Sequence, residues 1–242
     1  TTQFFKDGRI FTNYHVQGEW SLPSSANLFT GLYTSNHGLY PPEACVHFQD
    51  TISLSARLKK HVPLLGEIFR NEGYLTLFAT DNWRVHPLYG YTRGADRFLL
   101  YGKENNNEPD REIIYDAIEQ IKAFPERNHF LYLHLMKLHS GEPPAWSFSS
   151  EINCDLENRA TTKPDYKIRR KFDAAMANRN YQMVKETDEE LKLLYEKLNQ
   201  IYDKNDLVVC MLGDHGIVHL DEDEYLLSES MTRVPLWVLA HN

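Results

Sequence analysis

The sequence predicts an α/β fold in which a mostly parallel central sheet carries helices on both faces. Apolar runs of strand length alternate along the chain with amphipathic stretches of helical spacing, the order that builds parallel sheets. One run, Leu207–Leu212, consists of six consecutive apolar residues and predicts a central parallel strand buried on both faces. It stops at Gly213-Asp214-His215-Gly216, where small residues allow a sharp turn or a close approach.

Length and composition set the bounds. The 242 residues, 42% hydrophobic and 25% charged, suit one large α/β domain over residues 1–242. The net charge of −8 gives a nucleic-acid partner no electrostatic support, and three widely spaced cysteines argue against a disulfide scaffold. No apolar run reaches transmembrane length. Because the chain starts without Met and ends just after a strand-like segment, we expect residues on both sides of it. Composition does not indicate the oligomeric state.

The first elements follow from local signals. A mixed aromatic stretch predicts a strand over Ile10–Val16. Residues 21–31 predict a helix, with Pro23 in its first turn, Ser21 or Leu22 as its cap and Gly31 at its end. Helical spacing over Val62–Gly73 predicts the next helix, with Gly73 at its C-terminus.

The remaining elements continue the alternation. Apolar runs predict three further strands besides Leu207–Leu212, and amphipathic spacing predicts two further helices. The strands are Tyr74–Ala79, Phe130–Met136 and Arg233–Leu239, and the helices cover residues 111–124 and 165–203. Polar loops are expected over 101–110 and 141–164, the second near the mouth of a site.

Polar side chains follow several of the predicted strands. They are the 80–86 loop, His139 and the pair Asp214 and His215, and Ser21 lies at a helix N-terminus that favours an anion. Because carboxyl ends of parallel strands share one edge of a sheet, we expect these groups to meet there. Asp214 and His215 suit one divalent metal ion; the alternative is a capping Asp with a surface His. For Ser21 the alternative is a plain helix cap. His134, in mid-strand, is expected to be a hydrogen-bonded histidine of the core or of a sheet face.

The motifs resemble the sulfatase family in their order along nearly the whole chain. Residues 21–38 resemble its signature, C/S-x-P-S-R followed by L-T-G and an aromatic residue. The other similar segments are Glu72–Thr76 with Gly94–Phe98 (G-Y-x-T … G-F-D-x-F), the strand-end His139, Tyr181–Asp188 (Y-x-x-x-V-x-x-x-D), Asp214–Gly216 (D-[HN]-G) and Arg233–Leu236 (R-V-P-L).

This resemblance implies the alkaline-phosphatase-like superfamily, whose members attack the sulfur or phosphorus of an ester with a metal-bound oxygen nucleophile. It implies that Ser21 holds the nucleophile position and that Asp214 and His215 bind a divalent ion, Ca²⁺, Mg²⁺ or Mn²⁺. It assigns His139 a contact to the leaving group or oxyanion. Arg84, in the segment similar to the family's G-K-W-H, is expected to bind the sulfate or phosphate of the substrate; the alternative is pairing with Asp81 or Asp96.

Three departures from the family pattern leave alternatives open. The family oxidises Cys or Ser at position 21 to formylglycine, but the signature Arg is Ser25 here, so Ser21 is either converted or used unmodified. The family's lysine is replaced by Asn82. Its first strand, with one or two metal-binding aspartates, is not in this chain, so Asp214 and His215 are half of a metal site.

Three hypotheses follow. The first is a metal-dependent sulfatase-like hydrolase that cleaves a sulfate ester of a small molecule or glycan. The second is a phosphoester or phosphodiester hydrolase that uses unmodified Ser21. The third is a degenerate family member that binds anionic groups without turnover.

Overall fold

A computed structural model describes residues 6–18, 20–39, 57–101, 109–139, 166–216 and 229–240. The strands are β1 (Arg9–His15), β2 (Leu75–Thr80), β3 (Arg97–Leu100), β4 (His129–His134), β5 (Val208–Leu212) and β6 (Arg233–Ala240). The α-helices are α1 (Ser21–Thr30), α2 (Thr34–His37), α3 (Leu65–Asn71), α4 (Pro109–Ala123), α6 (Tyr166–Ile201) and α7 (Glu229–Thr232). Short 3₁₀ turns, η1 (Pro87–Tyr89), η2 (Lys137–His139) and η4 (Lys204–Asp206), complete the described elements.

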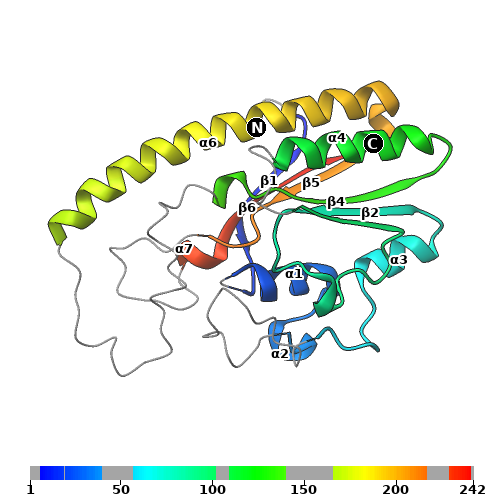
Figure 1. Ribbon diagram of the computed structural model, residues 1–242, viewed down its shortest axis with the longest axis horizontal. Coiled ribbons are helices and arrows are strands. Elements are labelled where there is room, and N and C mark those ends of the chain that lie inside the picture. The colour runs from blue at the N-terminus through cyan, green and yellow to red at the C-terminus, as the bar shows by residue number, and fades with distance from the viewer. Residues whose placement is uncertain are drawn as a thin grey trace.

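The described strands form two three-stranded sheets. In one, β2 pairs in parallel with β3 on one side and with β4 on the other. In the other, β6 pairs antiparallel with both β1 and β5. Helices α4 and α6 lie on one side of these strands, and α1 and α3 on the other (Figure 1). The prediction of an α/β fold with a parallel sheet and helices on both faces is therefore confirmed.

The prediction for the strand that precedes Asp214 was wrong in two respects. β5 pairs antiparallel with β6, not in parallel, and it is not buried on both faces, because Val208 is 67% exposed and Cys210 is exposed. An apolar run predicts burial but does not specify the neighbouring strands or their direction, which depend on segments distant in sequence.

Aromatic packing joins α1 to the parallel sheet. Phe29 is buried, and its ring meets those of Phe78 on β2, Tyr91 and Tyr132 on β4 edge-on at centroid distances of 4.7–5.4 Å. Such edge-to-face contacts add to the free energy gained by burying the rings. The Tyr91 hydroxyl donates to the Leu22 carbonyl at 2.6 Å. These contacts fix α1 near both of its ends, through Leu22 and Phe29.

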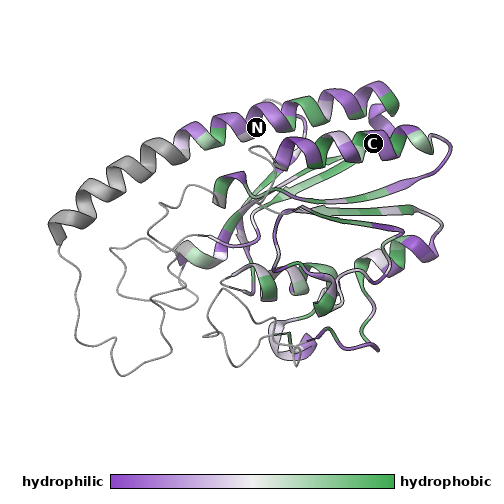
Figure 2. Ribbon diagram, viewed as in Figure 1, coloured by the Kyte–Doolittle hydropathy of each residue, from purple (hydrophilic) through white to green (hydrophobic). Residues whose placement is uncertain are grey.

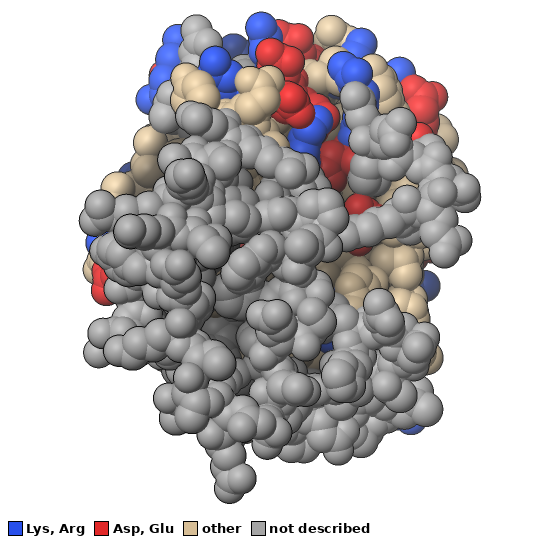
Figure 3. Space-filling view, turned by 60° about the vertical axis from the view of Figure 1, so that its left-hand side comes forward, with Lys and Arg blue, Asp and Glu red and all other residues tan. Residues whose placement is uncertain are grey.

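A second cluster holds α4 against α6. Ile118 and Ile121 pack with Leu198, and all three are buried. The hydropathy colouring shows apolar strands between helices whose outer faces are polar (Figure 2). Charges of both signs intermingle at the top of the view in Figure 3. In the described part of the chain, no helix combines the length and apolar character needed to cross a bilayer.

Most predicted boundaries are correct within two or three residues. Gly31 and Gly73 lie just beyond α1 and α3 with φ of +66° and +85°, a conformation that glycine adopts without strain. The strand β3 was not predicted, because its four residues carry too short a pattern. The 141–164 loop and most of the 101–110 loop lie outside the described residues.

Candidate active site

Four segments meet where β2, β4 and β5 end and α1 begins. The side chains of Asn82 and His134 touch at 3.1 Å between Nδ2 and Nε2. His134 Nε2 lies 3.8 Å from Asp214 Oδ2, and His215 Nε2 lies 3.3 Å from Ser21 Oγ. The structure thus brings Ser21 close to Asp214 and His215, which follow it in the sequence by 193 and 194 residues.

Ser21 is the first residue of α1 and is buried, 6% exposed. The expectation that Ser21 or Leu22 caps the helix was wrong, because the N-cap residue is Trp20, which makes no side-chain cap. The Ser21 hydroxyl faces His215. It therefore lies at the positive end of the α1 dipole, where negative charge on an oxygen is favoured.

Backbone contacts fix the Asp214–His215 segment. The Ser24 hydroxyl of α1 donates to the Asp214 carbonyl oxygen. Gly213 N–H donates to the Pro235 carbonyl at 3.2 Å, and Gly216 N–H donates to the Met231 carbonyl at 2.7 Å. Gly213 is needed for close packing, because a Cβ there would lie 3.2 Å from Val234 Cβ. These contacts tie the segment to α1 on one side and to β6 and α7 on the other.

The electrostatics favour an ionised Asp214. Burial works to raise the pKa of Asp214, but the His215 and His134 imidazoles, the nearby Ser21 hydroxyl and the His215 N–H together lower it below its ordinary value. Asp214 Oδ1 accepts the His215 N–H at 3.0 Å. Asp214 Oδ2 is buried and has no hydrogen-bond partner, and the Nε2 atoms of His215 and His134 lie 3.6 and 3.8 Å from it.

These donors fit a divalent metal ion. A buried carboxylate oxygen without a hydrogen-bond partner is costly unless it binds something. His215 Nδ1 contacts the Gly216 carbonyl at 2.7 Å, which leaves Nε2 with its lone pair toward Asp214 and Ser21. A backbone carbonyl on the second ring nitrogen is typical of metal-binding histidines. Among the described residues, no group of three or more His, Cys, Asp or Glu side chains could hold a metal ion, so Asp214 and His215 would make up only part of a coordination shell.

Arg84 lies near the start of α1, because its guanidinium contacts the ring of Trp20, the residue before Ser21. Its guanidinium carbon is 4.2 Å from the Trp83 ring centroid and 5.1 Å from that of Trp20. Burial lowers the pKa of Arg84, while Tyr89 raises it. Of the alternative partners, Asp96 pairs with Arg70 at 3.0 Å. The two indole rings hold the guanidinium by cation–π contacts near the N-terminus of α1.

His139 is the last residue of η2, which leaves the carboxyl end of β4. Its backbone is therefore on the predicted edge of the sheet, and its side chain lies outside the described part of the structure.

His134 lies in the candidate site although the sequence analysis did not place it there, and it contacts Asn82 of the 80–86 loop, which was expected there. His134 is not in mid-strand, because β4 ends there, two residues before the predicted end. The Arg84 N–H donates to Asn82 Oδ1 at 2.9 Å, so Asn82 Nδ2 is the donor to His134 Nε2. The proton of His134 is then on Nδ1, 2.8 Å from the Tyr132 hydroxyl. His134 is hydrogen-bonded as expected, and the signal for its place in the site was the strand end.

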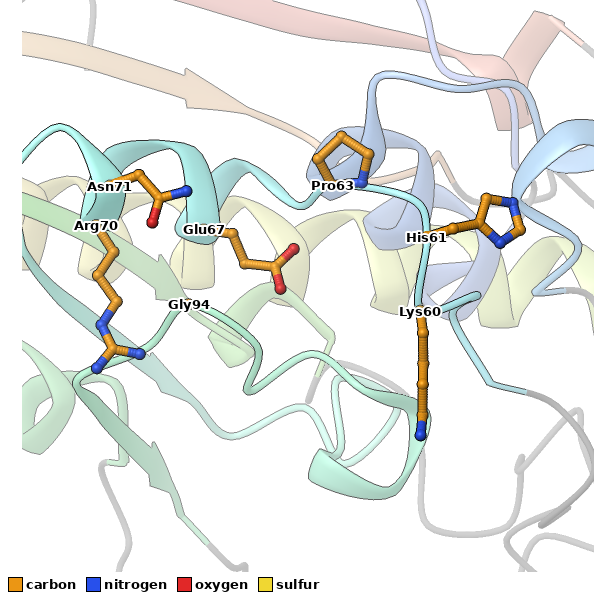
Figure 4. A pocket seen from close by; sticks show the side chains of 7 residues that line it. All are labelled: Lys60, His61, Pro63, Glu67, Arg70, Asn71 and Gly94. Atoms are coloured by element: carbon orange, nitrogen blue, oxygen red, sulfur yellow. The ribbon is translucent and has the colours of Figure 1, made fainter.

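The described residues also line a hollow of about 400 Å³ at the opposite end of the parallel strands. Its lining includes Glu67 and Arg70 on α3, and Gly94 just before β3 (Figure 4). Glu67 pairs with Arg93 at 2.8 Å and Arg70 with Asp96 at 3.0 Å. The hollow lies away from Ser21 and Asp214, and Glu67, the one carboxylate among its described lining residues, is already paired with Arg93.

Comparison with known proteins gives a family and a fold. The sulfatase family model matches residues 1–241. No curated protein matches the sequence. Similar solved structures include BT1596, a 2-O GAG sulfatase, with a TM-score of 0.60 and 16% identity over 99% of this chain and 58% of that chain.

Two further structures are similar. BT4656, solved with its substrate D-glucosamine-2-N,6-O-disulfate, has a TM-score of 0.62 and 15% identity over 98% of this chain and 65% of that chain. The lipoteichoic acid synthase LtaP from Listeria monocytogenes has a TM-score of 0.63 and 14% identity over 98% of this chain and 58% of that chain. At these identities the likeness shows the fold alone, and the chain spans less than two thirds of each neighbour.

Proposed function

The chain belongs to the sulfatase family, and on that premise we propose that it carries the active site of a metal-dependent hydrolase of sulfate esters. One observation supports this most strongly. The Ser21 hydroxyl lies 3.3 Å from His215 Nε2, beside the half-buried Asp214, whose buried Oδ2 has no hydrogen-bond partner. A site with an oxygen nucleophile, a carboxylate and an imidazole is suited to ester hydrolysis.

In this proposal the oxygen at position 21 attacks the sulfur while the bond between sulfur and the ester oxygen breaks, and the alcohol leaves with a proton. The attacking oxygen is either the Ser21 hydroxyl or a hydroxyl of the hydrated formylglycine made from Ser21. The α1 dipole favours the anionic form of this oxygen and also the charge on the transferred group. Ser21 is fixed by the packing of α1 against β2 and β4, so little reorganisation accompanies attack.

Asp214 and His215 are proposed to hold the divalent ion, Ca²⁺, Mg²⁺ or Mn²⁺. When bound, such an ion stabilises negative charge on the transferred group and lowers the pKa of the nucleophile. The lowered pKa of Asp214 keeps this carboxylate ionised at neutral pH, as a ligand must be. His215 presents Nε2 because Nδ1 contacts the Gly216 carbonyl.

Arg84 and His139 are proposed to act on the substrate. The Arg84 guanidinium, held over two indole rings, offers N–H groups to sulfate oxygens next to the α1 N-terminus. His139 is proposed to donate a hydrogen bond to the leaving group or the transferred oxyanion.

We further propose a sulfated glycan or small sulfate ester as substrate. Two structural neighbours are described as a GAG sulfatase and as a complex with a glucosamine disulfate. A second candidate is phosphoester hydrolysis by unmodified Ser21, which is favoured by Ser25 in place of the signature Arg.

The test is turnover by the purified protein with each of the three ions, on chromogenic aryl sulfate and aryl phosphate, combined with intact mass. Sulfate turnover with loss of two hydrogens at residue 21 supports the sulfatase with formylglycine. Sulfate turnover with unmodified Ser21 supports the hydroxyl nucleophile, and phosphate turnover alone supports the second candidate. Absence of both turnover and metal uptake would refute both and leave anion binding without catalysis.

A further inference from the structure

The turn that follows β4 is held by a buried carboxylate that has no place in the proposed chemistry. Asp110, in the first turn of α4, is 2% exposed. Its Oδ1 accepts the Met136 N–H and its Oδ2 accepts the Lys137 N–H, both at 2.8 Å. Both carboxylate oxygens are thus used to fix the backbone that enters η2 and leads to His139.

Helix α6 also holds the η2 turn, through ion pairs with the side chain of Lys137. Its Nζ lies 2.7 Å from Glu190 and 3.4 Å from Glu186, both on α6. Burial works to lower the pKa of Lys137, but the two carboxylates outweigh it and raise this pKa. Glu190 is 5% exposed, so this is a shielded ion pair. Two helices therefore hold one turn of three residues.

We propose that Asp110 is a positioning residue, which in its ionised form holds the backbone of the η2 turn that carries His139. The inference rests on the proposed function for the role of His139. The hold itself rests on the two hydrogen bonds to Met136 and Lys137. A protonated carboxyl turns one acceptor into a donor, so one of the two amides then loses its partner.

The charges around Asp110 place this change near neutral pH. Burial raises the pKa of Asp110 to about 6; the Met136 and Lys137 amides work to lower it, and the carboxylates of Glu190 on α6 and Asp81 after β2 raise it. Lys137 faces the same region from η2, but its ammonium is paired with the two glutamates of α6.

Protonation of Asp110 stabilises the folded protein but weakens the hydrogen bonds that hold the η2 turn. The pKa in the folded state exceeds the ordinary value of 3.8, so the folded protein binds the proton more tightly than the unfolded chain. The stabilisation from protonated Asp110 is complete below pH 3.8 and is lost as the pH rises through 6. Acid therefore loosens the turn without unfolding the protein through this group.

The experiment measures hydrogen exchange of the Met136 and Lys137 amides in the whole protein, expressed as protection factors from pH 5 to 8. We expect wild-type protection at these amides to fall about tenfold below pH 6, since one hydrogen bond is lost. Asp110→Asn should show the low protection at every pH, and its kcat/KM should lose the acid limb near pH 6. Protection that is independent of pH, and equal in the variant, would overturn the proposal.

Asp116→Asn is the matched control on the same helix. Its carboxylate is exposed and accepts the Tyr101 hydroxyl, so this variant should leave both amides and the pH profile unchanged. If Asp110→Asn does not fold, the wild-type pH series alone decides. If the protein turns over no ester, the proposed function fails, and hydrogen exchange still tests whether Asp110 holds the η2 turn. If turnover occurs and exchange of the two amides does not depend on Asp110, only this inference fails.

Discussion

The amino end of the parallel sheet and the opposite region, where β2, β4 and β5 end, both place polar side chains in buried or half-buried positions. They differ in how completely those groups are hydrogen-bonded. At the amino end, Asp96 accepts both the N–H and the hydroxyl of buried Thr76 and pairs with Arg70. The Glu67 carboxylate there accepts hydrogen bonds from Arg93 Nε and Nη2 and from the Leu64 N–H. At the carboxyl end, Asp214 Oδ2 is buried without a partner.

This difference separates a structural network from a site. A network that only stabilises a fold gains most when every donor and acceptor is satisfied. A buried carboxylate oxygen without a hydrogen-bond partner makes the folded protein less stable. With an imidazole and a hydroxyl that lie within 4 Å of each other beside it, the same oxygen is able to bind a ligand. Substitutions at the carboxyl end should therefore change activity, and those at the amino end should change stability.

The largest effect is expected from Asp214→Ala. This change removes the proposed metal ligand, so we expect metal uptake to disappear and kcat/KM to fall by more than about a thousandfold. The fold should keep its stability, because the lost carboxylate is half-buried and its buried Oδ2 has no hydrogen-bond partner. Metal titration by calorimetry and steady-state kinetics check this, with Asp206→Ala, an exposed aspartate just before β5, as the control. Full activity in Asp214→Ala would rule out the site.

The next effect is expected from Ser21→Ala. Loss of the nucleophilic oxygen should lower kcat by at least about a hundredfold, while metal binding by Asp214 and His215 persists. Ser35→Ala, an exposed serine on α2, should behave as wild type. If Ser21→Ala keeps its kcat, the oxygen at position 21 is not the nucleophile, even if the metal site is correct.

The sequence predicted the end of the sheet at which the site lies but not its full composition. Periodicity is a local property, so β2, β4 and the motif after β5 were found from short stretches. The strand order was not local, and neither the antiparallel pairing of β5 with β6 nor the four residues of β3 was predicted.

The same limit applies to individual site residues. Ser21, Asp214 and His215 were predicted because their motifs are contiguous. His134 was missed because its place in the site depends on where β4 ends and on its hydrogen bond with Asn82, 52 residues earlier in the chain. A contact of this kind is set by the pairing of β2 with β4, which no short window of sequence contains.

At the amino end, Asp96→Ala should show the reverse of Asp214→Ala. Thr76 is fully buried, and the substitution leaves its N–H without the carboxylate oxygen that accepts it, while its hydroxyl keeps the Gly94 carbonyl at 2.5 Å. We expect a loss of about 2 kcal/mol in the free energy of unfolding, with kcat/KM of the folded protein unchanged. Urea denaturation and kinetics on the same preparations check both. A large catalytic loss at full stability would contradict the division between the two ends.

The smallest effect is expected from Glu67→Gln, and it depends on pH. The hydrogen bond from Arg93 is the largest cause that lowers the pKa of Glu67 below 4.5, against the opposing effect of burial. A carboxyl with a depressed folded-state pKa contributes stability above its ordinary pKa, and this stability is lost as the pH falls through the folded-state pKa. Because the side chain is 34% exposed, solvent screening keeps the contribution below about 1 kcal/mol.

Glu67→Gln should therefore be slightly less stable than wild type in urea at pH 7 and equal to it at pH 3. Glu119→Gln, whose exposed carboxylate pairs with Lys122, should show no comparable gap at either pH. A gap that persists at pH 3 would mean that the glutamine disturbs packing, and that the charge of Glu67 is not what stabilises the amino end.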